Sequence, residues 1–188
     1  MKNKRIKLVL LLFACLSTLG PGSAAASPAA YKVQHDTLLV PKGKNMLYYV
    51  QRDPNTNTVV YELNLSANGV LNQAEPVHVF WIRYADGGER KELSYMQRKF
   101  AYGLNTRKLG KDSFELRFVS YSKLPLHLRK AKEGQYHVYV KINGQEAVLE
   151  RVFVRIEGGT LWVPNVVYVE LRGTETASGK LVTERFKP

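Results

Sequence analysis

The sequence predicts a mostly β fold: an antiparallel β-sandwich, or a partly open barrel, of about eight or nine strands with one helix near residues 89–103. Short runs rich in branched and aromatic residues recur at regular spacing along the chain. Clusters of Gly, Asn, Asp and Pro, which favour turns, separate these runs. Only one stretch shows convincing helical periodicity.

The first 26 residues have the order of a secretory signal peptide. The basic start MKNKRIK precedes the apolar run LVLLLFACLSTL, and small residues at positions 24–26 offer a cleavage site. The run is shorter than the ~20 apolar residues that a membrane span needs. We therefore expect an exported protein, periplasmic or secreted, whose mature chain does not span a membrane. Cys15, the sole cysteine, offers lipoprotein attachment as the less favoured alternative.

The mature chain is expected to comprise a polar lead-in at residues 27–44 and a single β-rich domain at residues 45–188. Residues 1–26 carry four basic residues and no acidic one, so their removal lowers the net charge from +12 to +8. Solubility is the first explanation of such a surplus. The partners that it favours are acidic glycans, anionic lipid or another envelope protein, rather than nucleic acid.

The first strands are expected directly after the lead-in. Residues 46–52 (MLYYVQR) and 59–65 (VVYELNL) flank the turn formers DPNTNT, which is a hairpin pattern. Residues 76–85 (PVHVFWIRYA) are the most strongly β stretch, and DGG ends it. After the helical stretch, further strands are predicted at residues 114–121, 126–129, 136–143, 148–156, 163–171 and 180–186.

Two details of the later strands follow from residue type. Asn143 and Gly144 both tolerate positive φ, so they predict a tight hairpin. Pro164 cannot donate to a strand ladder, so it marks an edge or entry position.

The helix is predicted for the stretch LSYMQRKFAYGL at residues 93–104. At ~100° per residue, one stripe is apolar and contains Leu93, Met96, Phe100 and Leu104. The opposite stripe mixes basic and aromatic side chains: Lys91, Tyr95, Arg98 and Tyr102.

This basic and aromatic stripe is the candidate ligand-binding surface. Aromatic rings stack on sugars and bases, and cations pair with phosphate or carboxylate. The candidate residues are Tyr95, Arg98, Lys99 and Tyr102, with Arg83 and Tyr84 nearby. The competing interpretation, which we favour, is an ordinary solvated helix face.

Other chemistry has weaker support. His127 and His137 would face each other if the loop between them turned at Lys132, but no third ligand is signalled and we expect no metal site. Glu150 alternates with Val148 and Val152 and is expected to point to an apolar face. Glu150, His78 and Asp53 are therefore the acid–base candidates if the protein is an enzyme. No nucleophile elbow, zinc-protease, phosphate-loop or dinucleotide-binding motif occurs, and no cofactor is expected.

Several motifs together resemble an uncharacterised family, the domain of unknown function 4833. They are PVHVFWIRY, ELSYMQRKFAYG, INGQEAVLERVFV, VPNVVYVELRG and SGKLVTERFKP, from about residue 45 to the end. The resemblance implies an exported protein whose domain has a helix after the Trp81 strand, and it implies no activity or cofactor.

The sequence thus favours an exported envelope protein that acts as a non-catalytic binding or structural module. Two alternatives stay open. One is a hydrolase-type enzyme with an unrecognised acid–base site, and the other is a peripheral binder of anionic lipid or polyanion.

Overall fold

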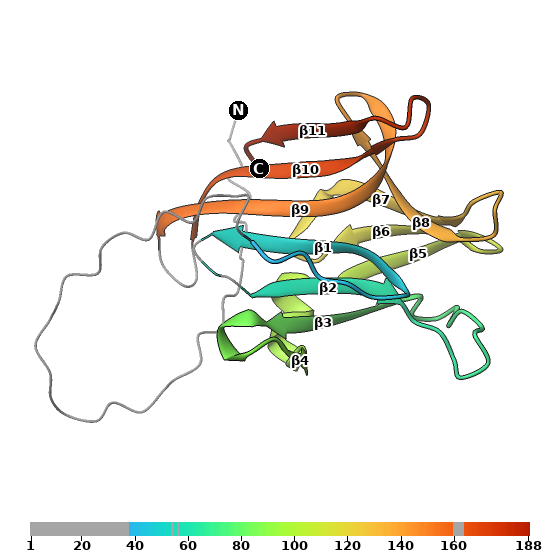
Figure 1. Cartoon of the computed structure of the whole chain (residues 1–188), viewed down its shortest axis with the longest axis horizontal. Coiled ribbons are helices and arrows are strands. Elements are labelled where there is room, and N and C mark those ends of the chain that lie inside the picture. Colours follow the sequence, from blue (N-terminus) through green and yellow to red (C-terminus); the bar gives the residue numbers. More distant parts are fainter. Residues whose placement is uncertain (1–37, 54, 56, 160–163) are drawn as a thin grey trace, which may run out of the picture.

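A computed structural model describes residues 38–53, 55, 57–159 and 164–188, and the strands within them form one curled mixed sheet, a half-barrel (Figure 1). The predicted mostly β fold with one helix is therefore confirmed, and of the two predicted forms, an antiparallel sandwich or a partly open barrel, the sheet takes the second, with β1 and β9 parallel. The predicted signal peptide and Cys15 lie outside the described residues.

Eleven strands occur in the described part of the chain, two or three more than predicted. Their hydrogen-bonded order is β4-β3-β2-β1-β9-β8-β7-β6-β5, and β10 pairs with both β9 and β11. Their bounds are β1 Met46–Asp53, β2 Thr58–Leu63, β3 Val77–Arg83, β4 Glu89–Glu92, β5 Leu104–Gly110, β6 Ser113–Phe118, β7 Tyr121–Lys130, β8 Tyr136–Ile142, β9 Gln145–Gly159, β10 Pro164–Glu175 and β11 Leu181–Phe186.

Strand β9 joins the two halves of the sheet. Its first residues pair antiparallel with β8, and residues 151–155 pair parallel with β1. Its other edge pairs with β10 along almost its whole length. In Figure 1, strands β1–β4 lie below β9, whereas β5–β8 gather at its right-hand end. The sheet therefore curls around an interior that both halves line.

A bulge in the β9–β10 pair changes which side chains face that interior. The register shifts between Arg172 and Gly173, opposite residues 149–151 of β9. Leu149 is buried before the bulge and Val152 after it, so the inward positions change from odd to even numbers. The prediction that Glu150 points to an apolar face is wrong for this reason. The Glu150 side chain is 40% exposed, and its carboxylate accepts a hydrogen bond from the Thr174 hydroxyl (2.6 Å).

The helical segment is shorter than predicted. It consists of a single α turn, α1 (Tyr95–Gln97), and a π turn, η3 (Arg98–Tyr102). A capping box fixes its start, because the Ser94 hydroxyl accepts from the Gln97 amide and the Gln97 side chain accepts from the Ser94 amide. Residues 89–92, included in the predicted helix, form the edge strand β4 instead.

Aromatic residues build the centre of the core. Tyr48 and Tyr61 are fully buried, and their rings stack with centroids 4.4 Å apart. Phe118 packs edge-on against both rings. The core thus ties β1 and β2 to β6, on the other half of the curl.

Two predictions concern which residues face each other in the hairpins β7–β8 and β8–β9. Asn143 (φ 51°) and Gly144 (φ 79°) form the predicted tight turn between β8 and β9. The predicted facing of His127 and His137 is wrong, since His127 pairs with Tyr139 and His137 with Arg129. The loop turns one residue later than assumed, and so the two imidazoles lie at different positions along the hairpin.

Candidate functional site

The candidate site is centred on Arg52, a buried arginine at the end of β1. Tyr48 and Val50 point into the half-barrel, so alternation along the strand points Arg52 inward as well. Only 9% of Arg52 is exposed. A guanidinium cannot be neutralised by losing its proton in a protein, so it stays charged at this position.

Four buried donor atoms without an acceptor among the described residues belong to this site. They are Nε and Nη1 of Arg52, Nε1 of Trp81 and the hydroxyl of Tyr102. Trp81 is 7% exposed and Tyr102 6% exposed. Buried polar groups are nearly always hydrogen-bonded, so several unpaired donors in one place require an explanation.

Two aromatic rings flank the guanidinium. Its central carbon lies 5.5 Å from the ring centroid of Trp81 and 5.8 Å from that of Tyr102. The two rings meet edge-on with centroids 5.0 Å apart. Such contacts favour a cation, but a ring face does not replace the acceptors that a guanidinium needs.

Separate elements place these aromatic side chains. Trp81 lies on β3, on the same face as Val77 and Val79, which are both in the core. Tyr102 ends the π turn, where its carbonyl accepts a hydrogen bond from the Tyr61 hydroxyl (2.8 Å). The site is therefore held by the rigid core rather than by loops alone.

The charges around Arg52 leave it without an acidic partner among the described residues. Asp53 faces the opposite side of β1, where it pairs with Arg155. Glu92 lies nearby, but its carboxylate pairs with His78 (2.9 Å) and Arg98 (3.5 Å). Burial raises the pKa of the Tyr102 hydroxyl, and the Arg52 guanidinium partly offsets that rise through its charge and a hydrogen bond to the Tyr102 oxygen. Tyr102 thus stays a neutral donor at physiological pH.

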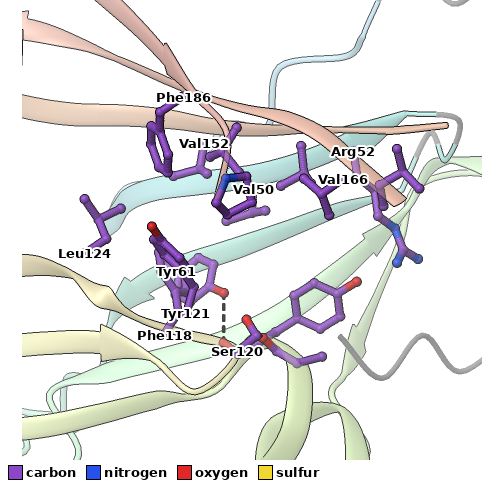
Figure 2. Close-up of a pocket in the computed structure, with 16 residues that line it drawn as sticks. Val50, Arg52, Tyr61, Phe118, Ser120, Tyr121, Leu124, Val152, Val166 and Phe186 are labelled. Carbon is purple, nitrogen blue, oxygen red and sulfur yellow. Dashed lines mark hydrogen bonds between the residues drawn. The ribbon is translucent and has the colours of Figure 1, made fainter. Parts of the chain in front are cut away.

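Arg52 separates two cavities of different character. On one side is a polar cleft of about 400 Å³, lined by donors that include Asn57, Arg83 and Lys91. On the other side is an apolar pocket of about 70 Å³ inside the curl of the sheet. Figure 2 shows Arg52 at one end of this pocket, with Leu124 and Phe186 at the opposite end.

The residues of the predicted basic and aromatic stripe are separated in the structure. Tyr95 is 70% exposed, whereas Tyr102 is buried. Arg98 pairs with Glu75 and Glu92, and Lys99 lies 5.4 Å from the Tyr95 ring. A π turn has more residues per turn than an α-helix, so it rotates Tyr102 away from the stripe and into the core.

The two other predicted ligand-binding residues lie at the end of β3. Arg83 lines the polar cleft and pairs with Asp86 (2.6 Å). Tyr84 begins the short helical turn η2 (Tyr84–Asp86) and is half-buried. The structure therefore brings Arg83 and Tyr102 toward one site, although on different sides of Arg52.

Arg52 and Trp81 were missed as site residues. The signal for Arg52 was available: it is a charged residue at an inward position of the alternating strand MLYYVQR. The absence of an acidic partner among the described residues depends on the packing of β3 and the π turn, which no local pattern encodes.

The acid–base candidates do not come together in one site, and Asp53 is buried. His78 lies between Glu62 (3.1 Å) and Glu92 (2.9 Å), and Arg90 also donates to Glu62 (2.6 Å). Asp53 and Glu150 each have their own polar partners. Each group is thus engaged in a local ionic or hydrogen-bond network. The described residues contain no cluster of three or more His, Cys, Asp or Glu suited to a metal ion.

The chain belongs to the family described as domain of unknown function (DUF4833), whose profile matches residues 48–185. Neither the curated proteins nor the solved structures include a match. Among the described residues, no helix has the length and apolar character required to cross a membrane.

Proposed function

We propose that this protein is an exported, non-catalytic binding module of the cell envelope and that its ligand carries an oxyanion. The observation that supports this most directly is the buried guanidinium of Arg52, whose Nε and Nη1 atoms, like the Trp81 Nε1 and Tyr102 hydroxyl donors beside it, have no acceptor among the described residues. The signal-peptide pattern of residues 1–26 supports export.

The energetic argument concerns the ligand-free state. An ionised group removed from water costs several kcal/mol unless partners compensate it. At Arg52, aromatic contacts supply only part of that compensation. A carboxylate or phosphate would supply the rest, because the fork of a guanidinium matches two oxygens of either group.

The surroundings favour binding of an anion over acid–base chemistry. Lys91 and Arg83 line the cleft next to Arg52; Lys91 adds positive potential, and Arg83 is paired with Asp86. The carboxylate that lines the same cleft, Glu92, is already paired with His78 and Arg98. The described lining therefore offers donors and cations for holding an oxyanion.

Fluorescence of Trp81 offers a direct test. The sequence has two tryptophans, so Trp162→Phe leaves Trp81 as the sole reporter. In that background, acetate and inorganic phosphate are titrated at constant ionic strength against the chain lacking its signal peptide. We expect saturable changes in Trp81 emission that Arg52→Met abolishes.

The matched control is Arg107→Met. It removes the same charge from an arginine whose side chain is 69% exposed on β5, outside the site. Equal titration curves for Arg52→Met and Arg107→Met would contradict the proposal, since net charge alone would then explain the response.

A further inference from the structure

We infer that the ligand is an amphiphile with a single alkyl chain, whose oxyanion head binds Arg52 and whose chain occupies the apolar pocket. This inference rests on the proposed function, because the same guanidinium binds the head. It adds the chemical class of the rest of the ligand.

Arg52 lines both cavities, so a head bound there lies at the entrance to the pocket. Beyond it the lining is almost wholly apolar and includes Val50, Phe118, Leu124, Val152, Val169 and Phe186. Two hydroxyls in this lining are already used within the protein: Ser120 donates to the Ala101 carbonyl and Tyr61 to that of Tyr102 (each 2.8 Å). The pocket is thus suited to a hydrocarbon chain with one charged end.

Burial of the site argues against a large polyanion. Arg52 is only 9% exposed, so a chain of sugars or nucleotides cannot bring successive charges to it. A small inorganic anion could bind the guanidinium but would leave the apolar pocket unfilled. The site has a charged group at one end and apolar walls along the rest. An amphiphile matches this arrangement better than a polyanion or a small inorganic anion does.

The size of the pocket limits the chain that fits without movement. Its volume of about 70 Å³ admits only a few groups the size of water, since each needs about 10–15 Å³. Longer chains must extend past Leu124 and Phe186, which are only half-buried. We therefore expect affinity to rise steeply over the first methylenes and then level off.

Calorimetric titration of a series of alkyl carboxylates measures this directly. Acetate, butanoate, hexanoate and octanoate are compared at constant ionic strength, with hexyl phosphate as the second kind of head. Burial of a methylene predicts a gain of about fourfold in affinity for each one added within the pocket. A stronger response to hexyl phosphate than to hexanoate would identify a phosphate head, and the reverse a carboxylate head.

Two substitutions at the far end of the pocket should change the best chain length in opposite directions. Leu124→Trp shortens the pocket, so it should remove the gain in affinity from longer chains. Phe186→Ala lengthens the chamber and should move the levelling-off to a longer chain. Leu109→Trp is the matched control, because Leu109 is 49% exposed on β5 and does not line the pocket.

The outcomes separate the two proposals. If acetate and octanoate bind equally and Arg52→Met abolishes both, the amphiphile inference is wrong and the oxyanion proposal stands. If affinity rises with chain length but Arg52→Met has no effect, the assigned head site is wrong and both proposals fail. If Leu124→Trp and Leu109→Trp alter the series alike, the pocket assigned to the chain is wrong. Both proposals also fail if no carboxylate or phosphate binds.

Discussion

At the scale of single residues, two arginines of neighbouring strands show opposite solutions to burial. Arg155 on β9 pairs with the buried carboxylate of Asp53 and also with Glu157 (2.8 Å). Arg52, one residue before Asp53, is more deeply buried and has aromatic rings in place of a carboxylate. The first arrangement stabilises the fold. The proposed function accounts for the second by a ligand that brings its own negative charge.

The first prediction compares these two arginines. Arg52→Met removes a buried charge that has no acidic partner among the described residues, so the free energy of unfolding without ligand should equal or exceed that of the wild type. Arg155→Met leaves Asp53 buried without its partner and should lower the free energy of unfolding by about 1–3 kcal/mol. Urea unfolding of both variants measures the difference. A larger loss for Arg52→Met than for Arg155→Met would show that Arg52 serves mainly the fold.

The second prediction concerns Glu170, a buried carboxylate on β10. Burial alone would raise its pKa, but hydrogen bonds from Arg185 and Arg151 (each 2.7 Å) overcome this and lower the pKa. A lowered pKa stabilises the folded state above the ordinary glutamate value of about 4.3. This stabilisation should be lost as the pH falls from that value through the lower pKa of the folded protein.

Urea unfolding between neutral pH and pH 3 measures this loss. Glu170→Gln should be less stable than the wild type at neutral pH, and the difference should shrink as the pH falls. Glu89→Gln, at an exposed glutamate on the edge strand β4, is the control. A constant difference across this range would refute the assignment of the pH dependence to Glu170.

At the scale of elements, local irregularities decide which side chains reach the site. The π turn brings Tyr102 into the core, and the bulge opposite Arg172 and Gly173 directs Glu150 away from it. The sequence predicted both segments but treated each as regular. In a regular helix or strand, a fixed period decides on which face each side chain lies. One extra residue in a helical turn or a strand ladder moves all later side chains to a different face.

The third prediction tests the end of the π turn. At Gly103 a Cβ atom would lie 2.0 Å from the carbonyl oxygen of Arg98, so Gly103→Ala must displace the turn. We expect a loss of stability of about 1–3 kcal/mol and weaker anion binding, because Tyr102 precedes this glycine. Thermal unfolding and the Trp81 titration measure the two effects.

Gly110→Ala is the matched control for this variant. Gly110 lies on β5, is exposed, and has no atom within 4 Å of the position of an added Cβ. We expect its unfolding free energy to stay within about 0.5 kcal/mol of the wild type. Similar behaviour of the two variants would contradict the role assigned to the close contact at Gly103.

At the scale of the whole molecule, the sequence predicted the class of fold better than it predicted how the sheet closes through the pairing of distant strands. Alternation and turn residues were enough to predict most strands, the first hairpin and the Asn143–Gly144 turn. They could not predict that β1 pairs parallel with β9, because that contact joins segments about a hundred residues apart. The site depends on this closure, since it brings Val152 and Val154 of β9 alongside Val50 and Arg52.

The same limit applies to the candidate site. Residue types suggested a basic and aromatic surface, and Tyr102 and Arg83 do lie near Arg52 in the structure. Within the part of the chain that the structure describes, packing among β1, β3 and the π turn leaves Nε and Nη1 of Arg52 without an acceptor. Residue types alone therefore suggested the chemistry of the site but did not reveal its centre.

The most direct test of the central claim is a nuclear magnetic resonance measurement of the buried donors themselves. The Nε1–H signal of Trp81 and the Nε–H signal of Arg52 are recorded with and without saturating hexanoate. If these donors bind the oxyanion, both signals should move downfield and exchange more slowly with water when the ligand is present. Hexanoate binding that leaves both signals unchanged would show that the ligand lies elsewhere and would contradict the account.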